Sequence, residues 1–365
     1  MWSEMKIGRN DLLAVAENAA KFTASRSSLP VLAMVKLSLE NTRVVISATN
    51  LEQSSELRTI TSVTGDDAFD ATLVDGKMFA EVLKQTVGQT IELNKNGARL
   101  FVMDGEFEAS LPTMDVDRFP PLELNTCGDV YSIPVREIAE KVVICASTEM
   151  ARPSLQGVRI ECANGRLSAA ATDGFRVAIL EKDMAGVADF SAIIPAAVFG
   201  TASKVLLNDG NLDASAQGGQ IVFTDGANKI GALLVEGSFP NYRDVVPKQT
   251  KVRVTLGRVD LLTALKKISV FAKDDHNIAL LDFGKESVRV SGQSEESGAG
   301  KSVVWCENDG DDLTIGFNVR FLREILGAMK SPAIKIAMNG ANQPAVITGD
   351  GDTGLTYVVM PMHIG

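Results

Sequence analysis

Histidine and cysteine are scarce in this chain of 365 residues, and their scarcity excludes several kinds of catalytic centre. The two histidines, His276 and His363, belong to no H-E-x-x-H motif, and no G-x-S-x-G motif occurs, so a hydrolase or metal centre has little to build on. The four cysteines are Cys127, Cys145, Cys162 and Cys306. They are too far apart for a C-x-x-C pair, which predicts reduced thiols. We therefore expect no catalytic residues, no metal and no cofactor.

Long apolar runs are also missing. No stretch approaches the roughly 18 apolar residues that a membrane span requires, although 45% of the residues are hydrophobic. The N-terminal segment MWSEMKIGRNDLL has neither the basic start, the apolar core nor the cleavage site of a secretory signal. The sequence therefore predicts a soluble, cytoplasmic protein with no membrane partner and with cores for two or three domains.

One phosphate-binding motif is incomplete. Gly300-Lys301-Ser302 matches the end of a P-loop, but Glu295 occupies the place of the required first glycine. The residues that follow Ser302 are β-branched and aromatic where a helix should begin. A hairpin turn is the favoured interpretation. An ATP-hydrolysing enzyme stays open as an alternative, and such an enzyme would bind nucleotide at Lys301.

A threefold internal repeat organises the chain. A strand end, a polar cap and an amphipathic helix begin at Ile7, Ile133 and Thr255, and each helix is followed by a hairpin with alternating burial. A second strand and a short helix then recur in each unit. Equivalent phenylalanines in these helices lie 120 and 122 residues apart, at Phe79, Phe199 and Phe321.

The repeat predicts an α+β protein of three similar domains, each with two helices and about eight strands. Chance similarity among generic βα units is less favoured, because the same order occurs three times in phase. The expected domains are residues 1–127, 128–249 and 250–365. The tail YVVMPMHIG, Tyr357 to Gly365, then occupies the position of a final strand, although chain ends are usually polar and disordered.

Recognisable segments are spread along the chain: SSLPVLAMVKLSLEN near residue 30, ATDGFRVAI at 171–179, SFPNYRDVVP at 238–247, GFNVRFLREILGAMK at 316–330 and YVVMPMHI at 357–364. Together they resemble the bacterial DNA polymerase III beta subunits, the sliding clamps. The resemblance implies three DNA-clamp domains, each with two helices and two antiparallel sheets. It also implies a head-to-tail homodimer, closed into a six-domain ring that encircles double-stranded DNA irrespective of sequence and has no catalysis of its own.

The resemblance further implies a pocket between the second and third domains for a short apolar peptide. The partners would be the DNA polymerase III alpha subunit, the clamp loader, and other polymerases and repair proteins that carry a clamp-binding motif. The matching positions are Leu155, Thr172, Gly174, Phe175, Arg176, Val177, Pro240, Asp244, Val245, Val358, Met360, Pro361 and Met362.

Methionine suits this pocket, because its flexible and polarizable side chain adapts to several partners. The alternative is a final strand that only packs on its own domain. Phe175, Asp244 and His363 depart from the family pattern and make the rim of the pocket less basic. The charges that a partner peptide would carry therefore stay open.

The net charge of −10 argues against a protein that coats nucleic acid by bulk attraction. Nevertheless, the six expected helical segments carry 15 Lys and Arg against 8 Asp and Glu, which suits a basic lining inside an acidic ring. A general preference of helices for Lys and Arg is the alternative. Those segments are 10–26, 76–87, 136–152, 195–207, 258–273 and 320–330. The expected DNA contacts are Arg26, Lys204, Lys266 and Lys267.

The resemblance places the contact between subunits at Val270 and Phe271 of one chain and near Phe107 of the next. These apolar residues could equally belong to a domain core. A peptide-binding scaffold that never encircles DNA also stays open, and ring closure distinguishes it from a clamp.

Overall fold

The computed structural model describes residues 3–24, 27–65, 69–126, 130–184, 189–206, 212–272, 277–294 and 298–363. The chain divides into two compact units, each described here by itself. The first consists of Met1–Pro134 with Thr201–Leu234, and the second of Val135–Gly200 with Val235–Gly365. Each unit contains one continuous sheet. These units do not test the three domain boundaries expected from the repeat, which stay a prediction.

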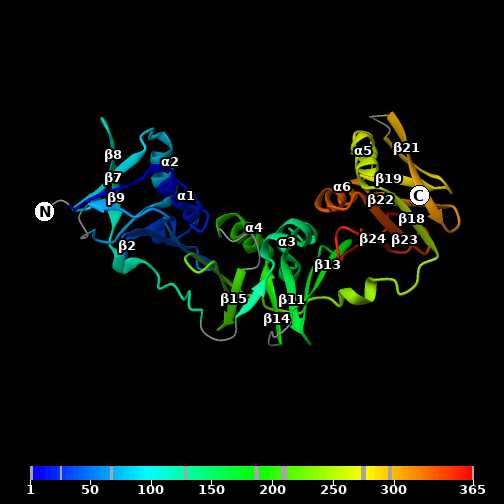
Figure 1. Cartoon of the computed structure of the whole chain (residues 1–365), viewed down its shortest axis with the longest axis horizontal. Helices are drawn as coiled ribbons and strands as arrows, with labels where there is room; N and C mark the ends of the chain where they lie inside the picture. Colours follow the sequence, from blue (N-terminus) through cyan, green and yellow to red (C-terminus); the bar gives the residue numbers. More distant parts are fainter. Residues whose placement is uncertain are drawn as a thin grey trace. The chain divides into compact units, whose positions relative to one another are not determined.

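The first unit is built on a sheet of 13 antiparallel strands (Figure 1). In sheet order the strands are β10 (Tyr131–Ile133), β15 (Leu212–Gln217), β16 (Gln220–Thr224), β17 (Lys229–Leu233), β4 (Gln53–Arg58), β3 (Arg43–Thr49), β2 (Met34–Glu40), β6 (Thr72–Asp75), β9 (Phe107–Met114), β8 (Arg99–Asp104), β7 (Thr90–Asn96), β1 (Ser3–Gly8) and β5 (Thr64–Gly65). Short 3-10 turns, η1 (Pro30–Ala33) and η2 (Val116–Arg118), lie between strands.

Two helices of the first unit, α1 (Arg9–Ala20) and α2 (Gly76–Gln85), contact each other (Figure 1). The helix α2 begins after Asp75, whose side chain accepts a hydrogen bond from the amide of Met78 at 2.8 Å, as expected of an N-cap. Phe79 and Leu83 are buried four residues apart on one face of α2. The amphipathic pattern of the sequence therefore gives this helix its buried side.

The second unit is built on a sheet of 12 antiparallel strands. In sheet order they are β14 (Phe190–Pro195), β11 (Gly157–Ala163), β12 (Arg166–Thr172), β13 (Arg176–Asp183), β25 (Leu355–Val359), β24 (Ala345–Thr348), β23 (Ala333–Met338), β18 (Val252–Gly257), β21 (Gly298–Asp309), β20 (Ser287–Ser294), β19 (Ile278–Phe283) and β22 (Leu313–Asn318). The sheet is continuous from the middle repeat to the third, because β13 pairs with β25.

The helices of the second unit are α5 (Arg258–Ile268) and α6 (Val319–Ala328), which contact each other, and a mixed helix near its start. The helix α4 (Ala196–Val205) contributes residues to both units. Two 3-10 turns, η5 (Pro153–Gln156) and η6 (Tyr242–Val245), complete the unit. Each repeat thus contains two helical segments, and the described residues contain nine, eight and eight strands in the three repeats, close to the expected number.

The mixed helix corrects the expected helix at 136–152. It consists of α3 (Val135–Glu137), the π-helical η3 (Ile138–Val142) and the 3-10 turn η4 (Val143–Cys145), and the backbone is extended at Ala146. The β-branched run Val142-Val143-Ile144 loses side-chain freedom in a helix. Ser147 then accepts a hydrogen bond from the amide of Glu149 at 3.1 Å, a local alternative to helical pairing. The helix therefore ends before Thr148.

Candidate functional site

A cavity of about 260 Å³ lies where β13 and β25 meet in the second unit. The strands pair there with Val177 opposite Val358. Most of the pocket positions implied by the resemblance line this one cavity: Leu155, Thr172, Gly174, Phe175, Arg176, Val177, Pro240, Val245, Val358 and Met360. The fold therefore brings together residues from four separate segments of the chain.

A tight turn from Thr172 to Arg176 forms one wall of the cavity. The hydroxyl of Thr172 donates to the carbonyl of Arg176 at 2.7 Å and accepts from the amide of Gly174 at 3.1 Å. The carboxylate of Asp173 accepts from the amides of Phe175 and Arg176 at 2.9 and 3.0 Å. Gly174 has a φ of +93°, which glycine adopts without steric cost. The turn leaves Phe175 at the rim, 58% exposed.

The floor of the cavity is apolar. Val177 and Val358 are buried in one cluster with Tyr242, and Phe239 packs against that cluster. The Tyr242 ring meets the Phe239 ring edge to face, with centroids 6.1 Å apart. Its hydroxyl donates to Glu161 at 3.2 Å and lies 2.9 Å from the hydroxyl of Ser168, so the polar end of this ring is paired. Such a floor suits apolar side chains.

Arg152 and Arg176 are the charged members of the lining; Arg152 is exposed, whereas Arg176 is only 5% exposed. The Nε of Arg176 donates to Asp173 at 2.9 Å, and one Nη lies 2.6 Å from Glu324 of α6. The guanidinium also lies 4.4 Å from the ring centroid of Phe321. Burial alone would lower the pKa of Arg176, but its charged and hydrogen-bonding neighbours outweigh burial and raise it. The cavity wall therefore holds a permanent, paired cation.

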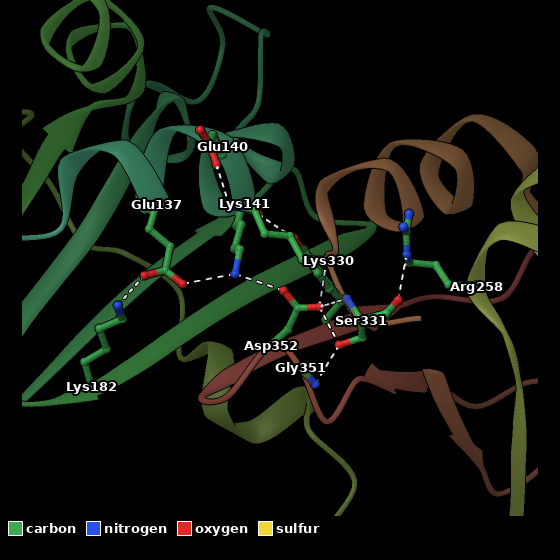
Figure 2. Close-up of polar contacts among 10 residues, drawn as sticks. Glu137, Glu140, Lys141, Lys182, Arg258, Lys330, Ser331, Gly351 and Asp352 are labelled. Carbon is green, nitrogen blue, oxygen red and sulfur yellow. Dashed lines mark hydrogen bonds and ion pairs between the residues drawn. The ribbon is translucent and has the colours of Figure 1, made fainter. Parts of the chain in front are cut away.

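A buried ion pair, between Lys141 and Asp352, connects the middle and third repeats (Figure 2). The Nζ of Lys141 lies 3.0 Å from Glu137 and 2.9 Å from Asp352, while Glu137 also pairs with Lys182. Tyr357 donates from its hydroxyl to the carbonyl of Lys141 at 2.8 Å. Because Tyr357 belongs to β25, these contacts hold the strand that carries Val358 against the mixed helix of the middle repeat.

Asp352 is 2% exposed and accepts several hydrogen bonds (Figure 2). The donors are the amide and hydroxyl of Ser331, at 2.8 and 2.7 Å, and the amide of Lys330 at 2.9 Å. Burial alone would raise the pKa of Asp352, but the bonds from Ser331, Lys141 and Lys330 outweigh burial and lower the pKa to about 2. The carboxylate is therefore ionised at any ordinary pH.

The described cysteines are unsuited to chemistry. Cys145, Cys162 and Cys306 are free and buried. Burial raises the pKa of Cys145 to about 12, and burial also raises those of Cys162 and Cys306. A thiol reacts as the thiolate, so these groups are inert at neutral pH. Cys127 lies outside the described residues.

Three of the implied pocket positions do not line the cavity. Met362 instead donates from its amide to the carbonyl of Gly316 in β22 at 2.8 Å, forming an isolated bridge with that strand. Pro361 lies between that bridge and β25. Asp244 is exposed in η6 and accepts from the Asn241 side chain at 2.6 Å. The two methionines of the tail therefore have different roles: Met360 lines the cavity, whereas Met362 holds the end of the chain to β22.

Three lining residues were absent from the implied set: Arg152, Asn241 and Tyr242. Asn241 and Tyr242 lie within the SFPNYRDVVP segment, so that segment was the available signal for them. Arg152 precedes Pro153 and had no signal in the sequence. Its position at the cavity follows from the path of the chain after the shortened helix.

Most of the expected DNA contacts and subunit contacts that the structure describes are exposed. Lys204, Lys266 and Lys267 are exposed, and Arg26 lies outside the described residues. Phe107 and Val270 are also exposed, so neither is a core residue of the single chain. Phe271 is half-buried and lies against Gly300, where an added Cβ would come within 2.5 Å of its ring.

The incomplete P-loop motif is part of a strand. Gly300, Lys301 and Ser302 lie inside β21 and pair with β20, with Lys301 opposite Ser291. The expected hairpin turn at these residues is therefore wrong, and the strand continues past Ser302, where a phosphate site requires a helix. The geometry excludes a P-loop at Lys301.

The described residues offer neither a metal cluster nor a membrane-spanning helix. No group of three or more His, Cys, Asp and Glu side chains within the described ranges could hold a metal ion. None of the helices in those ranges is both long and apolar enough to cross a membrane.

Comparisons with known proteins cover the whole chain. Three family models match consecutive segments: DNA polymerase III beta subunit, N-terminal domain, at residues 3–123; central domain, at 130–241; and C-terminal domain, at 243–363. A beta sliding clamp of Staphylococcus aureus (strain Mu50) is 23% identical over 373 residues, covering 99% of each protein.

Solved structures agree in fold. The DNA polymerase III beta subunit of Thermotoga maritima superimposes with a TM-score of 0.91 at 22% identity, covering 100% of each chain. The DNA polymerase sliding clamp of Bacillus subtilis gives a TM-score of 0.92 at 21% identity, also with full coverage of both chains. Because the three family models together match nearly the whole chain, this protein belongs to the DNA polymerase III beta subunit family.

Proposed function

We propose that this chain is a cytoplasmic DNA sliding clamp that encircles duplex DNA as a head-to-tail homodimer and holds partner proteins through the cavity between β13 and β25. Membership of the family makes it a non-catalytic processivity factor that tethers DNA polymerases. The observation that carries the proposal is the cavity itself, in which ten of the positions expected from the family pattern lie around one apolar floor.

The cavity suits an apolar peptide from a partner protein. Its floor is closed by Val177 and Val358, while Phe175 and Met360 stand exposed at the rim and adapt to the peptide. The partners that we propose are the DNA polymerase III alpha subunit, the clamp loader, and other polymerases and repair proteins with a clamp-binding motif. One shared site means that these partners compete with each other.

The charges suit weak contact with DNA phosphates. Lys204, Lys266 and Lys267 are exposed on helices or their ends, while the protein as a whole carries a net charge of −10. A few lysines attract phosphates without reading bases, and the acidic remainder disfavours binding outside the ring. Retention on DNA then depends on enclosure and not on affinity.

Two strand edges support the proposed subunit contact. Residues 298–305 of β21 pair with β20 on one side only, since β18 reaches no further than Cys306. Residues 107–112 of β9 pair with β8 in the same one-sided way. Unpaired edges with exposed apolar neighbours, here Phe107 and Val270, favour pairing with another chain.

The test of the proposed site is the affinity of a short fluorescein-labelled peptide with leucine and phenylalanine anchors. Met360→Asp places a charge at the apolar rim, and we expect it to weaken binding by roughly 30-fold or more, as at a binding hot spot. Met150→Asp is the matched control, because Met150 is 88% exposed and does not line the cavity. Undiminished affinity in the Met360 variant, with an intact dimer, would contradict the proposal.

A further inference from the structure

Arg176 places a cation in the wall of a cavity that otherwise suits apolar groups. Its Nε is bound to Asp173 at 2.9 Å, but the other oxygen of Asp173 already accepts the amides of Phe175 and Arg176. One Nη has a different partner, the carboxylate of Glu324, at 2.6 Å. Glu324 is therefore the carboxylate that faces the outer end of the guanidinium.

Glu324 comes from a different repeat and has a second cation within reach. It lies on α6, is 40% exposed, and its other oxygen is 3.7 Å from the Nε of Arg320. Both guanidiniums are near the ring of Phe321, at 4.4 Å from its centroid for Arg176 and 5.5 Å for Arg320. The other neighbour of that ring is Phe175, at 6.5 Å between centroids. Glu324 therefore shares one small cluster with two lining residues of the cavity.

We propose that Glu324 is a positioning residue that tunes the charge selectivity of the cavity, by neutralising Arg176 so that this buried arginine does not add to the attraction of acidic peptides. The inference rests on the proposed peptide-binding function. Glu324 acts through Arg176 and does not itself line the cavity. Without its carboxylate, the Nη groups of Arg176 become available to a carboxylate on the peptide, and a charge-assisted hydrogen bond replaces the internal one.

The size of the effect follows from one unit of charge a few ångströms from the ligand. At the effective dielectric constant of a partly exposed site, removal of Glu324 changes the relative affinity for a singly charged peptide roughly fivefold. Salt screens part of this difference, because the cluster is partly exposed. A merely structural role for Glu324 would change the affinity for charged and neutral peptides equally.

The experiment compares two fluorescein-labelled peptides on the full-length protein. Both carry the same leucine and phenylalanine anchors, and they differ only by Glu in place of Gln beside the anchor. The variants are Glu324→Gln and, as a matched control, Glu181→Gln. Glu181 also pairs with an arginine, Arg166, at 3.1 Å, but it does not line the cavity.

We expect wild type and Glu181→Gln to show the same ratio of affinities for the two peptides, a ratio that includes the attraction of the exposed Arg152. Glu324→Gln should shift this ratio roughly fivefold toward the acidic peptide, and high salt should reduce the shift. An unchanged ratio in Glu324→Gln, with both peptides bound, would overturn the inference and leave the proposed function intact. Failure of wild type to bind either peptide would instead overturn the proposed function.

Discussion

Two turns between strands, at residues 49–53 and 172–176, have the same hydrogen bonds to the backbone but different side chains around them. They are called the first and the second corner. At the first corner, the Thr49 hydroxyl donates to the carbonyl of Gln53 at 3.1 Å and accepts from the amide of Leu51 at 3.0 Å. The side chain of Asn50 accepts from the amides two and three residues later, as that of Asp173 does at the second corner. The strand that follows, β4, pairs with β17 of the middle repeat, as β13 pairs with β25 of the third.

The side chains decide which corner contains a cavity for a partner. Opposite Ser54 in the first corner stands Gly231, where an added Cβ would come within 2.5 Å of the Leu124 side chain. The chain thus packs its own leucine at the place where the second corner has Val358 beside open space. A repeated fold supplies equivalent positions, and the side chains at one of them provide the function.

The strands that close the two corners are also held differently. Before β17, Asn228 accepts from the amide of Arg58 at 2.8 Å, a contact between uncharged groups. Before β25, Asp352 is buried against Lys141 and Ser331. The second corner therefore depends on an ionised network, which mutation and pH should both disrupt.

The largest expected effect is that of Asp352→Asn. This change leaves Lys141 buried with one carboxylate fewer, so the free energy of unfolding should fall by about 3 kcal/mol in urea unfolding at pH 7. Asp350→Asn is the control, because Asp350 is 85% exposed and pairs with Lys335 at 2.9 Å on the surface. That control should change stability by less than about 1 kcal/mol. Equal losses would mean that burial of the pair does not matter.

The pH dependence of wild type should reveal the same carboxylate. Since the folded pKa of Asp352 is about 2, below its ordinary value, its ionised form stabilises the folded state. That contribution, about 2 kcal/mol, is fully present above roughly pH 4 and is lost as the pH falls toward 2. Urea unfolding of wild type and Asp352→Asn between pH 5 and pH 2 should therefore converge. Parallel curves would contradict the assignment.

A smaller effect compares the turns themselves. Gly174 has a φ of +93° and no close neighbour for a Cβ, so Gly174→Ala should lower the free energy of unfolding by about 1 kcal/mol through backbone strain alone. Leu51 has a φ of +75° and is exposed, so Leu51→Gly relieves strain and should raise stability by roughly 0.5 kcal/mol. Urea unfolding measures both. A loss of stability in Leu51→Gly would show that its side chain packs favourably.

The sequence was sufficient for the repeating architecture and for most of the cavity. Period and order of the elements predicted two helices in each repeat, because amphipathic faces such as that of Phe79 and Leu83 are local patterns. The cavity positions came from resemblance to the family, and ten of them line it. Tertiary contacts explain why the other expected positions do not line the cavity. Met362 pairs with Gly316, and its residue type gives no sign of that partner.

The buried network was invisible in the sequence for the same reason. Lys141 and Asp352 are more than 200 positions apart, and neither residue type predicts burial. The π-helical turn at Ile138–Val142 also departs from the regular period on which the expectation for 136–152 rested. Local patterns predict the elements, but the contacts that hold Val358 at the cavity depend on where the folded chain brings distant segments together.

The central claim is that the protein is retained on DNA by enclosure. The most direct measurement loads the full-length protein onto closed circular DNA with its clamp loader, raises the salt, and then cuts the circle with a restriction enzyme. We expect the protein to stay on the uncut circle in salt that removes it from short linear DNA, and cutting should release it, because exposed lysines alone bind phosphates weakly at high salt. Equal rates of loss from circular and linear DNA would mean that enclosure does not retain the protein.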